Sequence, residues 1–316
     1  MIDLIPASEI TDLSIIIVSW NTRPHLRRCL ESLEVARDLF NHQFEVLVID
    51  NGSVDGSQQM IDSEFGMVQL IRNNQNLGFA RANNQGLARA RGRYLMLLNP
   101  DTEVMPAALS ELLSFMENDQ AAGAAGPKLL NPDGSLQISC YPIPSLIREL
   151  WRLFHLDRLH PLAAYPHSWW QARQPLTVDM AQGACLMLRR EALRKVGMLD
   201  ERFFMYTEEV DLCLRLRNAG WRIHWVPSAV VTHYGGQSTS QSSEAMFLEL
   251  YRSKILFFRK HYGRAAAAIY KGILTAASLT RLALTPVAAL VDRSKSARTA
   301  ALAGNYLRLI RAMPGL

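Results

Sequence analysis

Cysteine is scarce in this 316-residue sequence, and its spacing matches no metal-binding or redox motif. Cys29, Cys140, Cys185 and Cys213 are widely separated, and no two of them form a CxxC pair. That spacing excludes a zinc knuckle and a thioredoxin-like redox motif. Because all of these residues lie in apolar or helical contexts, we expect buried free thiols in a reducing cytosol.

Several enzyme signatures are also missing. No G-x-G-x-x-G follows the first apolar run, which argues against a dinucleotide-binding domain, and no G-x-x-x-x-G-K-[ST] indicates a P-loop NTPase. The G-x-S-x-G nucleophile elbow and the H-E-x-x-H zinc motif are absent as well. The first 13 residues carry acids but no basic region followed by a long apolar run. We therefore do not expect a signal peptide at this position.

Positive charge is concentrated in the last part of the chain. From Arg259 onward there are ten Lys and Arg residues and one acid, Asp292, which gives this segment a charge of +9. The total is +5, so the preceding residues carry −4. This distribution argues against a nucleic-acid-binding body and favours a tail that meets an anionic surface.

Apolar runs alternate with amphipathic stretches through the first part of the chain. We expect strands over residues 14–19, 45–49, 68–71 and 94–98, and helices from about Pro24, through Ala90 and from about Pro106. Such alternation predicts βαβ units and a largely parallel sheet. The proline-rich residues 131–175 are expected to form irregular loops and short helices over a face of this sheet. A strand over 184–188, helices over 191–196 and 208–219, and two short strands over 222–226 and 229–232 follow.

Acidic and imidazole side chains stand at the ends of these expected elements. Asp101 directly follows the apolar residues 94–98, Glu208, Glu209 and Asp211 begin a helix, and His233 follows a short strand. Oxygen ligands with an imidazole suit Mn²⁺ or Mg²⁺ better than a structural zinc ion. Simpler explanations stay open for each group taken alone. The acid in residues 99–101 (NPD) or in residues 50–53 (DNGS) suits a turn, the helix-opening acids complement the helix dipole, and a histidine often only makes hydrogen bonds.

The order of these segments and their amino-acid sequences resemble those of the family 2 glycosyltransferases. The sequences of the motifs are most similar to the rhamnosyltransferase-like branch of that family. The resemblance covers roughly residues 13–262. It is carried by residues 16–21 (IIVSWN), 48–57 (VIDNGSVDGS), 76–84 (NLGFARANN), 97–102 (LLNPDT), 203–215 (FFMYTEEVDLCLR) and 230–236 (VVTHYGG).

The resemblance implies an α/β protein of the GT-A fold, a Rossmann-like, mostly parallel sheet flanked by helices, which binds a nucleotide-sugar donor. It implies that Asp50 accepts from a ring N–H of the donor's base. Asp55 and Asn84 would support Asp50, and Asn76 and Gly78 would lie in the same nucleotide-binding half.

For the reacting groups, the resemblance implies that Asp101 holds a divalent metal, Mn²⁺ or Mg²⁺, with His233 as a second metal or diphosphate ligand. Glu209 falls where the family has the aspartate that acts as general base, and Asp211 would fix the helix or the acceptor. The chain departs from the family pattern at two of these places. Residues 99–101 offer one carboxylate where relatives have two or three, and Glu209 replaces an aspartate, so Glu208 or Asp211 stay candidates for the base.

The sequence thus predicts a catalytic domain over residues 1–262, with a nucleotide-sugar-binding half at 13–130 and an acceptor-side half at 131–262. An amphipathic, basic, helical tail over 263–316 follows. Residues 272–291 have the length of a membrane span, about 20 residues. Arg281 and Pro286 oppose insertion, so a single span is not expected. The tail is expected to lie on the cytoplasmic membrane surface, or to pack as a helical pair on the body or on a second subunit of a homo-oligomer.

The predicted function is inverting transfer of a hexose from a nucleotide-diphosphate donor, dTDP-rhamnose or a UDP-sugar, to a hydroxyl of a lipid-linked or polysaccharide acceptor in cell-surface glycan synthesis. The enzyme would be cytoplasmic and peripheral on the inner face of the membrane, with no nucleic acid as a partner. Two alternatives stay open. A sugar-nucleotide nucleotidyltransferase would have a glycine-rich basic loop after the first strand, which residues 20–23 (WNTR) do not supply. A non-catalytic assembly protein that kept the fold would have lost the acids near residue 209, which are present.

Overall fold

A computed structural model describes residues 11–291 and 296–316 of the protein. Residues 1–10, on which the expectation about a signal peptide falls, lie outside the described residues, as do Asp292, Arg293 and Lys295 of the basic tail. The chain divides into two compact units. We call Met1–Ile143, Pro166–Phe204 and Glu208–Gln241 the sheet unit, and Pro144–Tyr165, Met205–Thr207 and Ser242–Leu316 the helical unit. The sequence predicted a catalytic domain ending at residue 262, whereas this division falls after Gln241.

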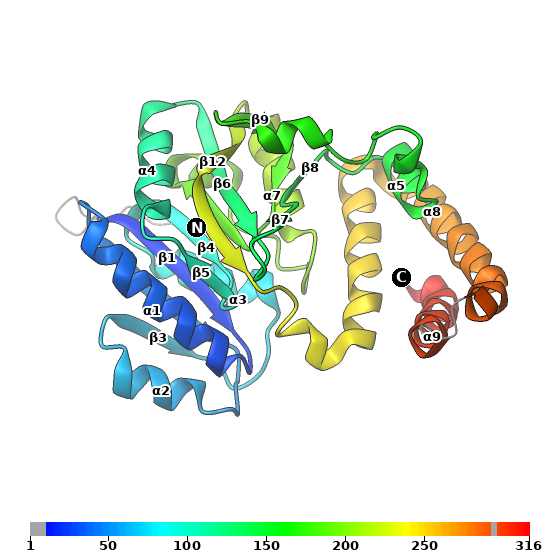
Figure 1. The fold of residues 1–316 in the computed structure, drawn as a ribbon, viewed down its shortest axis with the longest axis horizontal. Coiled ribbons are helices and arrows are strands. Elements are labelled where there is room, and N and C mark those ends of the chain that lie inside the picture. The colour runs from blue at the N-terminus through cyan, green and yellow to red at the C-terminus, as the bar shows by residue number, and fades with distance from the viewer. Residues whose placement is uncertain (1–10, 292–295) are drawn as a thin grey trace. The chain divides into compact units, whose positions relative to one another are not determined.

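The sheet unit is built around one mixed sheet with the order β3-β2-β1-β4-β11-β6-β12-β5 (Figure 1). Strands β7 and β9 pair with β6 and β12, and β8 and β10 form a separate small sheet. The strands are β1 (Thr11–Ser19), β2 (Phe44–Asp50), β3 (Val68–Arg72), β4 (Gly92–Leu98), β5 (Thr102–Val104), β6 (Ala122–Leu130), β7 (Leu136–Gln137), β8 (Cys140–Tyr141), β9 (Leu176–Val178), β10 (Met180–Ala181), β11 (Cys185–Arg189) and β12 (Arg222–His233).

Helices connect these strands and continue into the helical unit. They are α1 (Arg23–Leu39), α2 (Ser57–Glu64), α3 (Phe79–Arg89), α4 (Ala108–Asn118), α5 (Leu146–Leu153), α6 (Arg190–Val196), α7 (Glu208–Asn218), α8 (Ser243–Val291) and α9 (Ser296–Ala312). Short 3-10 helices occur at Leu156–Arg158 (η2), His167–Gln171 (η3), Thr239–Ser242 (η4) and Met313–Gly315 (η6). The strands and helices expected up to residue 118 are thereby confirmed within a few residues.

The parallel pairing of β3, β2, β1 and β4 positions the site. Strand β1 lies between β2 and β4, with Ser19 opposite Asp50 and Ile17 opposite Leu98. The chain runs from β1 to β2 and β3 on one side and then returns to β4 on the other. Ligands of α/β sheets bind beyond the carboxyl ends of the strands at such a reversal. The residues that follow β1, β2 and β4 therefore share one edge of the sheet.

The two faces of this sheet are covered by different helices. Successive side chains of each strand point to opposite faces, so both faces have apolar side chains to bury. The apolar residues of α1, α2 and α4 pack in one core with Ile15, Ile17 and Val48. On the other face, α3 lies close because Gly86 has no side chain, and a Cβ there would be 2.6 Å from Ile16 and 2.8 Å from Ile49. All the cysteines are buried and free, as expected. Burial raises the pKa of Cys29, Cys140 and Cys213 to about 12.

Two expectations about the second half of the sheet unit are wrong. Residues 222–226 and 229–232 form one strand, β12, because an irregularity in its pairing with β6 between Val226 and Val230 takes up the break expected there. Residues 131–175 do not simply cover a sheet face. Strand β7 joins the sheet at β6, and residues 144–165 belong to the helical unit.

The helical unit has an apolar core of its own. Helix α8 contains a break at Gly263 (φ 87°, ψ 174°) that divides it into two helical parts. Side chains of α5, both parts of α8 and α9 meet around Phe258 and Tyr270, whose rings stack with centroids 4.6 Å apart. In the described parts of the chain, no helix is both long and apolar enough to cross a membrane. Arg281 instead donates to the carbonyl of Leu153 at 2.6 Å. The tail thus packs with α5 and the first part of α8.

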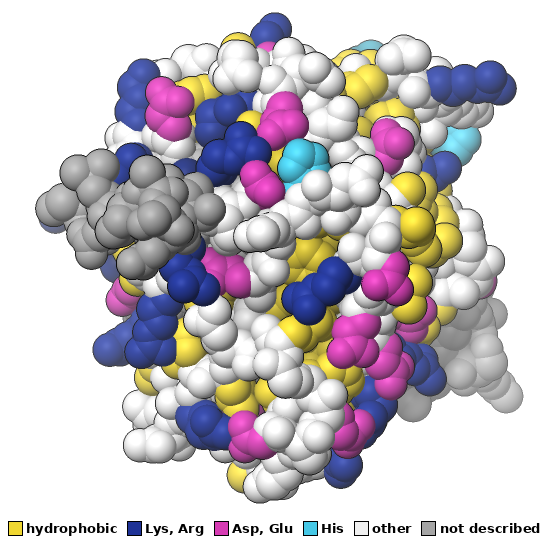
Figure 2. Space-filling view, turned by 90° about the vertical axis from the view of Figure 1, so that its left-hand side faces the viewer, with side chains coloured by type: hydrophobic (Ala, Val, Ile, Leu, Met, Phe, Trp, Pro, Cys, Tyr) yellow, Lys and Arg dark blue, Asp and Glu magenta, His cyan; other side chains and the backbone are white. Residues whose placement is uncertain are grey.

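One face of the molecule shows how its surface charge is arranged. On the side that faces left in Figure 1, basic and acidic side chains are interspersed, with a few hydrophobic side chains between them (Figure 2). Nucleic acids bind where basic side chains gather against the phosphate backbone. This face presents no extended field of positive charge.

Candidate active site

Asp50 ends β2 and keeps one carboxylate oxygen unused. Its Oδ1 accepts hydrogen bonds from the N–H groups of Gly52 (3.2 Å) and Ser53 (2.9 Å) and from Nε2 of Gln58 (2.6 Å). Its Oδ2 is buried and has no hydrogen-bond partner among the described residues. A buried acceptor without a donor is costly unless a ligand supplies one. Asp50 is therefore held in place through one oxygen and offers the other to a donor such as a ring N–H.

Asp101 and His233 are brought together by a short ladder of strands. Strand β5, which begins directly after Asp101, pairs antiparallel with the end of β12, so His233 lies opposite Thr102. The N–H of Tyr234 also donates to the carbonyl of Asp101 at 2.9 Å. As a result, His233 Nε2 lies 3.4 Å from Asp101 Oδ1, and both side chains are largely buried. The N–H of Gln237 also donates to Asp101 Oδ2, at 3.4 Å.

The hydrogen bonds of Gln137 determine which nitrogen of His233 faces Asp101. Gln137 donates through Nε2 to Asn131 Oδ1 (2.9 Å) and to the carbonyl of His233 (3.2 Å). Its Oε1 therefore accepts from His233 Nδ1, at 2.7 Å. Asn99 lies 3.3 Å from His233 Nε2, where its Nδ2 can donate. The imidazole thus presents the lone pair of Nε2 on the side of Asp101.

A carboxylate and an imidazole lone pair side by side form a donor set that Mn²⁺ and Mg²⁺ accept. Within residues 11–291 and 296–316, no group of three or more His, Cys, Asp or Glu side chains is placed to hold a metal ion. Asp101 and His233 fit such an ion as a pair. Mg²⁺-type sites commonly complete their coordination with substrate phosphates and water.

The acids of α7 reach the same edge of the sheet. A Cβ on Gly183 would lie 3.6 Å from Cβ of Glu209. The next residue, Ala184, accepts at its carbonyl the N–H of Asn99 at 2.9 Å, just beyond the end of β4. Glu209 therefore lies at the same edge of the sheet as Asp101, next to the residues that precede β11.

Asp211 has a different role. Its Oδ2 accepts from Arg215 Nε at 2.9 Å, and the carboxylate is fully buried. Arg215 also donates to the carbonyls of Val196, Gly197 and Met198. Asp211 therefore fixes α7 to the segment after α6.

Tyr206 (φ 68°) and Thr207 (φ 72°), which directly precede α7, adopt left-handed backbone angles that residues other than glycine rarely adopt.

Four residues expected near the nucleotide make contacts within the protein. Asp55 accepts from the N–H of Arg23 (2.7 Å) and from Ser57, the first residues of α1 and α2. Asn84 donates to the carbonyl of Leu199 (2.9 Å) and accepts from its N–H (3.1 Å).

The other two residues hold the turn that leads into α3. Asn76 accepts from Asn51 Nδ2 (3.1 Å) and from the N–H of Gly78 (2.9 Å). At Gly78 (φ 85°) a Cβ would be 2.5 Å from the carbonyl oxygen of Phe204, so that only glycine fits. Asn84 and Gly78 thus tie the segment before α7 to the strand–helix units that carry Asp50.

Sequence reasoning missed several residues that complete the site. Gln58 and Gln137 orient Asp50 and His233, and Gly183 lies next to Glu209. No local pattern marks them, because Gln58 is an ordinary polar residue of α2, Gln137 lies in a two-residue strand and Gly183 lies in a loop.

Comparison with known proteins shows the family of this chain. Residues 14–197 match the family model described as glycosyl transferase family 2. The chain is 33% identical over 266 residues to the N-acetylglucosaminyl-diphospho-decaprenol L-rhamnosyltransferase of Mycobacterium tuberculosis, covering 79% of this chain and 85% of that protein. It is 24% identical over 231 residues to the rhamnosyltransferase WbbL of Escherichia coli K12, covering 70% and 82%.

Among solved structures, the fold is similar to the mannosyltransferase PcManGT from Pyrobaculum calidifontis in complex with GDP-Man and Mn²⁺. The TM-score is 0.56 at 15% identity, over 96% of this chain and 86% of that chain. The fold is thus that of the GT-A glycosyltransferases. The chain belongs to glycosyltransferase family 2, and its sequence places it with the rhamnosyltransferase-like members. Family membership removes the nucleotidyltransferase alternative.

Proposed function

We propose that this enzyme transfers a sugar with inversion, aided by a divalent cation, from a nucleotide-diphosphate donor to a hydroxyl of a lipid-linked or polysaccharide acceptor. The observation that carries the proposal is that three groups lie along one edge of the sheet. They are the unpartnered Oδ2 of Asp50, the Asp101–His233 pair, and Glu209 beside Gly183. These groups suit, in turn, a base, a diphosphate with its cation, and an acceptor hydroxyl.

Inversion at the sugar requires a single displacement, in which the acceptor attacks one side of the reacting carbon and the diphosphate leaves from the opposite side. Glu209 takes the proton of the acceptor hydroxyl as its oxygen forms a bond to C1 of the sugar. The bond between C1 and the diphosphate oxygen breaks on the opposite side, and its electron pair leaves with the nucleoside diphosphate. Asp101 and His233 would hold a divalent cation, which when bound would supply charge neutralisation for this leaving group.

The named relatives support a deoxyhexose donor and a lipid-linked acceptor. The M. tuberculosis and E. coli proteins are named rhamnosyltransferases, and the former name includes a diphospho-decaprenol acceptor. We therefore place dTDP-rhamnose first among donors, with UDP-sugars next, and cell-surface glycan synthesis as the setting.

A position at the inner face of the membrane is also part of the proposal. The segment from Arg259 onward carries +9, and the second part of α8 exposes Ile269, Leu279 and Leu284 by half or more. Basic side chains near exposed apolar ones favour contact with anionic lipid.

A screen of nucleotide sugars by thermal shift, with and without Mn²⁺, tests the donor site. We expect a dTDP- or UDP-sugar to raise the melting temperature, with the larger rise in Mn²⁺, and Asp101→Ala to abolish the additional rise due to Mn²⁺. Asp38→Ala removes an exposed carboxylate from α1 and is the matched control. If no nucleotide sugar raises the melting temperature, the non-catalytic alternative replaces the transferase.

Gln137 gives a second test, which reads metal binding directly. Removing its Oε1 in Gln137→Leu frees His233 to rotate or to exchange its tautomer. Loss of such a hydrogen bond to a metal-binding histidine weakens metal affinity about 10–100-fold. Calorimetric titration of Mn²⁺ into the enzyme saturated with dTDP measures this, and Gln59→Leu on the exposed side of α2 is the control. Equal Mn²⁺ affinity in Gln137→Leu and the wild type would show that Gln137 does not position a metal ligand.

A further inference from the structure

The helical unit contains a basic cavity that the transfer reaction does not use. It has a volume of about 370 Å³ and is lined by Arg259, Arg264, Ala267, Ala268 and Lys271. This volume lies within the range of small-molecule sites, roughly 300–1,000 Å³. Every lining side chain is therefore either a cation or a methyl group, and no acid contributes to the wall.

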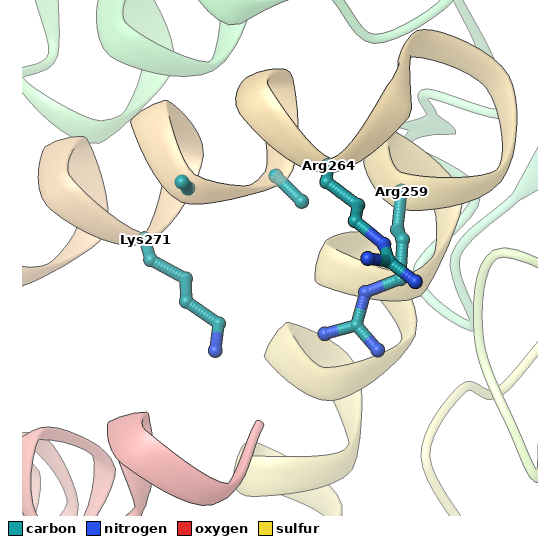
Figure 3. A pocket seen from close by; sticks show the side chains of 5 residues that line it. Arg259, Arg264 and Lys271 are labelled. Atoms are coloured by element: carbon teal, nitrogen blue, oxygen red, sulfur yellow. The ribbon is translucent and has the colours of Figure 1, made fainter.

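The break in α8 produces this cavity. Arg259 belongs to the helical part before Gly263, and the other lining residues belong to the part after it. Positions 264, 267, 268 and 271 follow the i, i+3, i+4, i+7 spacing of one helix face, so Arg264 and Lys271 are two turns apart on the same side. The alanines between them leave open space. Figure 3 shows the Arg259 and Arg264 side chains next to each other, with Lys271 extending into the same space.

The three cations keep most of their hydrogen-bonding capacity. Arg259 donates to the carbonyl of Leu316 at 3.0 Å and Lys271 to that of Met313 at 3.2 Å. Among the described residues, Arg264 makes no hydrogen bond or ion pair, and neither Arg259 nor Lys271 pairs with an Asp or Glu side chain. Each cation therefore has N–H groups left for a ligand.

The break adds a further source of positive potential. The helical part that begins at Arg264 has its first N–H groups without partners inside the helix, and its dipole is positive at this end. Two guanidinium groups side by side repel each other unless an anion lies between them. The planar guanidinium matches the oxygens of a phosphate in a bidentate manner. The charge, the geometry and the volume all suit a phosphate group.

We propose that Arg259, Arg264 and Lys271 form a binding site for a phosphate group, carried by a membrane lipid or free in solution. The site is independent of the sugar-transfer reaction proposed above, since none of its residues belongs to the sheet unit. Exposed Tyr262 and Ile269 lie on either side of the break at Gly263 and would contact acyl chains if the phosphate is that of a lipid.

Binding measurements on the full chain test this site without reference to catalysis. One arm titrates inorganic phosphate and pyrophosphate by calorimetry. The other sediments the protein with phosphatidylcholine vesicles that contain or lack phosphatidylglycerol. Binding only to the phosphatidylglycerol vesicles identifies the phosphate of an anionic lipid, and binding of the soluble anions identifies a free phosphate.

Variants assign the binding to this cavity. We expect Arg264→Gln and Lys271→Gln each to weaken the binding by about tenfold, since a hydrogen bond to a charged group contributes on that order. Arg252→Gln removes the same charge from an exposed position of α8 outside the cavity and should bind as the wild type does. The proposal is overturned if neither arm shows binding, or if the cavity variants bind as tightly as Arg252→Gln.

Discussion

Glu209→Gln is expected to reduce sugar transfer by about 10²–10⁴-fold, the usual contribution of a positioned general base. The amide keeps the size and the hydrogen-bonding oxygen of the side chain but cannot take the acceptor's proton. The place of Glu209 beside Gly183 is unchanged by this substitution, and Asp50, Asp101 and His233 are untouched. The thermal shift caused by the donor with Mn²⁺ should therefore equal that of the wild type, while turnover measured by release of nucleoside diphosphate falls.

Glu208→Gln is the matched control, because it removes a neighbouring carboxylate from the same first turn of α7. It should keep most of the activity. Full activity in Glu209→Gln together with an inactive Glu208→Gln would move the base to Glu208. Asp211 is not an equivalent control, since its ion pair with Arg215 at 2.9 Å makes any substitution there a structural one.

Glu149→Leu is expected to lower the free energy of unfolding by about 3–5 kcal/mol, as for other buried ion pairs that lose one partner. Glu149 of α5 is fully buried and contacts Lys254 Nζ of α8 at 3.0 Å. It also accepts from the hydroxyl of Tyr270 at 3.4 Å and pairs with Arg152. Without the carboxylate, the largely buried Lys254 has no compensating charge. Urea denaturation of the full chain, followed by circular dichroism, measures the loss.

The double variant Glu149→Leu/Lys254→Met tests whether the loss of stability comes from leaving Lys254 without its partner. Removing both charges should recover most of the stability, because an apolar pair of similar size has no desolvation cost. Glu244→Gln, which breaks an exposed ion pair with Arg308, should cost at most about 1 kcal/mol. A single variant Glu149→Leu as stable as Glu244→Gln would mean that Lys254 is not held by Glu149.

The sequence was sufficient for the elements whose signals are local. Strand β4 and the acid that follows it were predictable because residues 94–98 are an uninterrupted apolar run that ends at Asn99. The approach of Asp101 to His233 was not available from any local pattern. It depends on β5, a three-residue strand, pairing with β12 across more than a hundred residues. Only the resemblance to a family brought the two residues together in advance.

The contacts of Gly78 and Asn84 show where such reasoning ends. Both residues lie in a motif that the family resemblance assigns to the nucleotide, yet they contact Phe204 and Leu199 of the segment before α7. The break at Gly263 was equally hidden, because a single glycine inside a helical sequence is usually tolerated. The ion pair of Glu149 with Lys254 joins residues 105 positions apart. Each of these features depends on tertiary packing, which produces no periodic pattern of apolar residues in the sequence.

The unused oxygen of Asp50 has a consequence for how donors are sorted. A carboxylate accepts hydrogen bonds and donates none, so in the proposed site a base that turns a ring nitrogen toward Oδ2 must carry a proton on that nitrogen. Uracil, thymine and guanine have that proton, whereas adenine and cytosine have a lone pair there. Sites built to pair a polar group reject analogues that leave it unpaired by large factors. Because adenine and cytosine lack this hydrogen atom, the site would exclude ADP- and CDP-linked sugars, whatever sugar they carry.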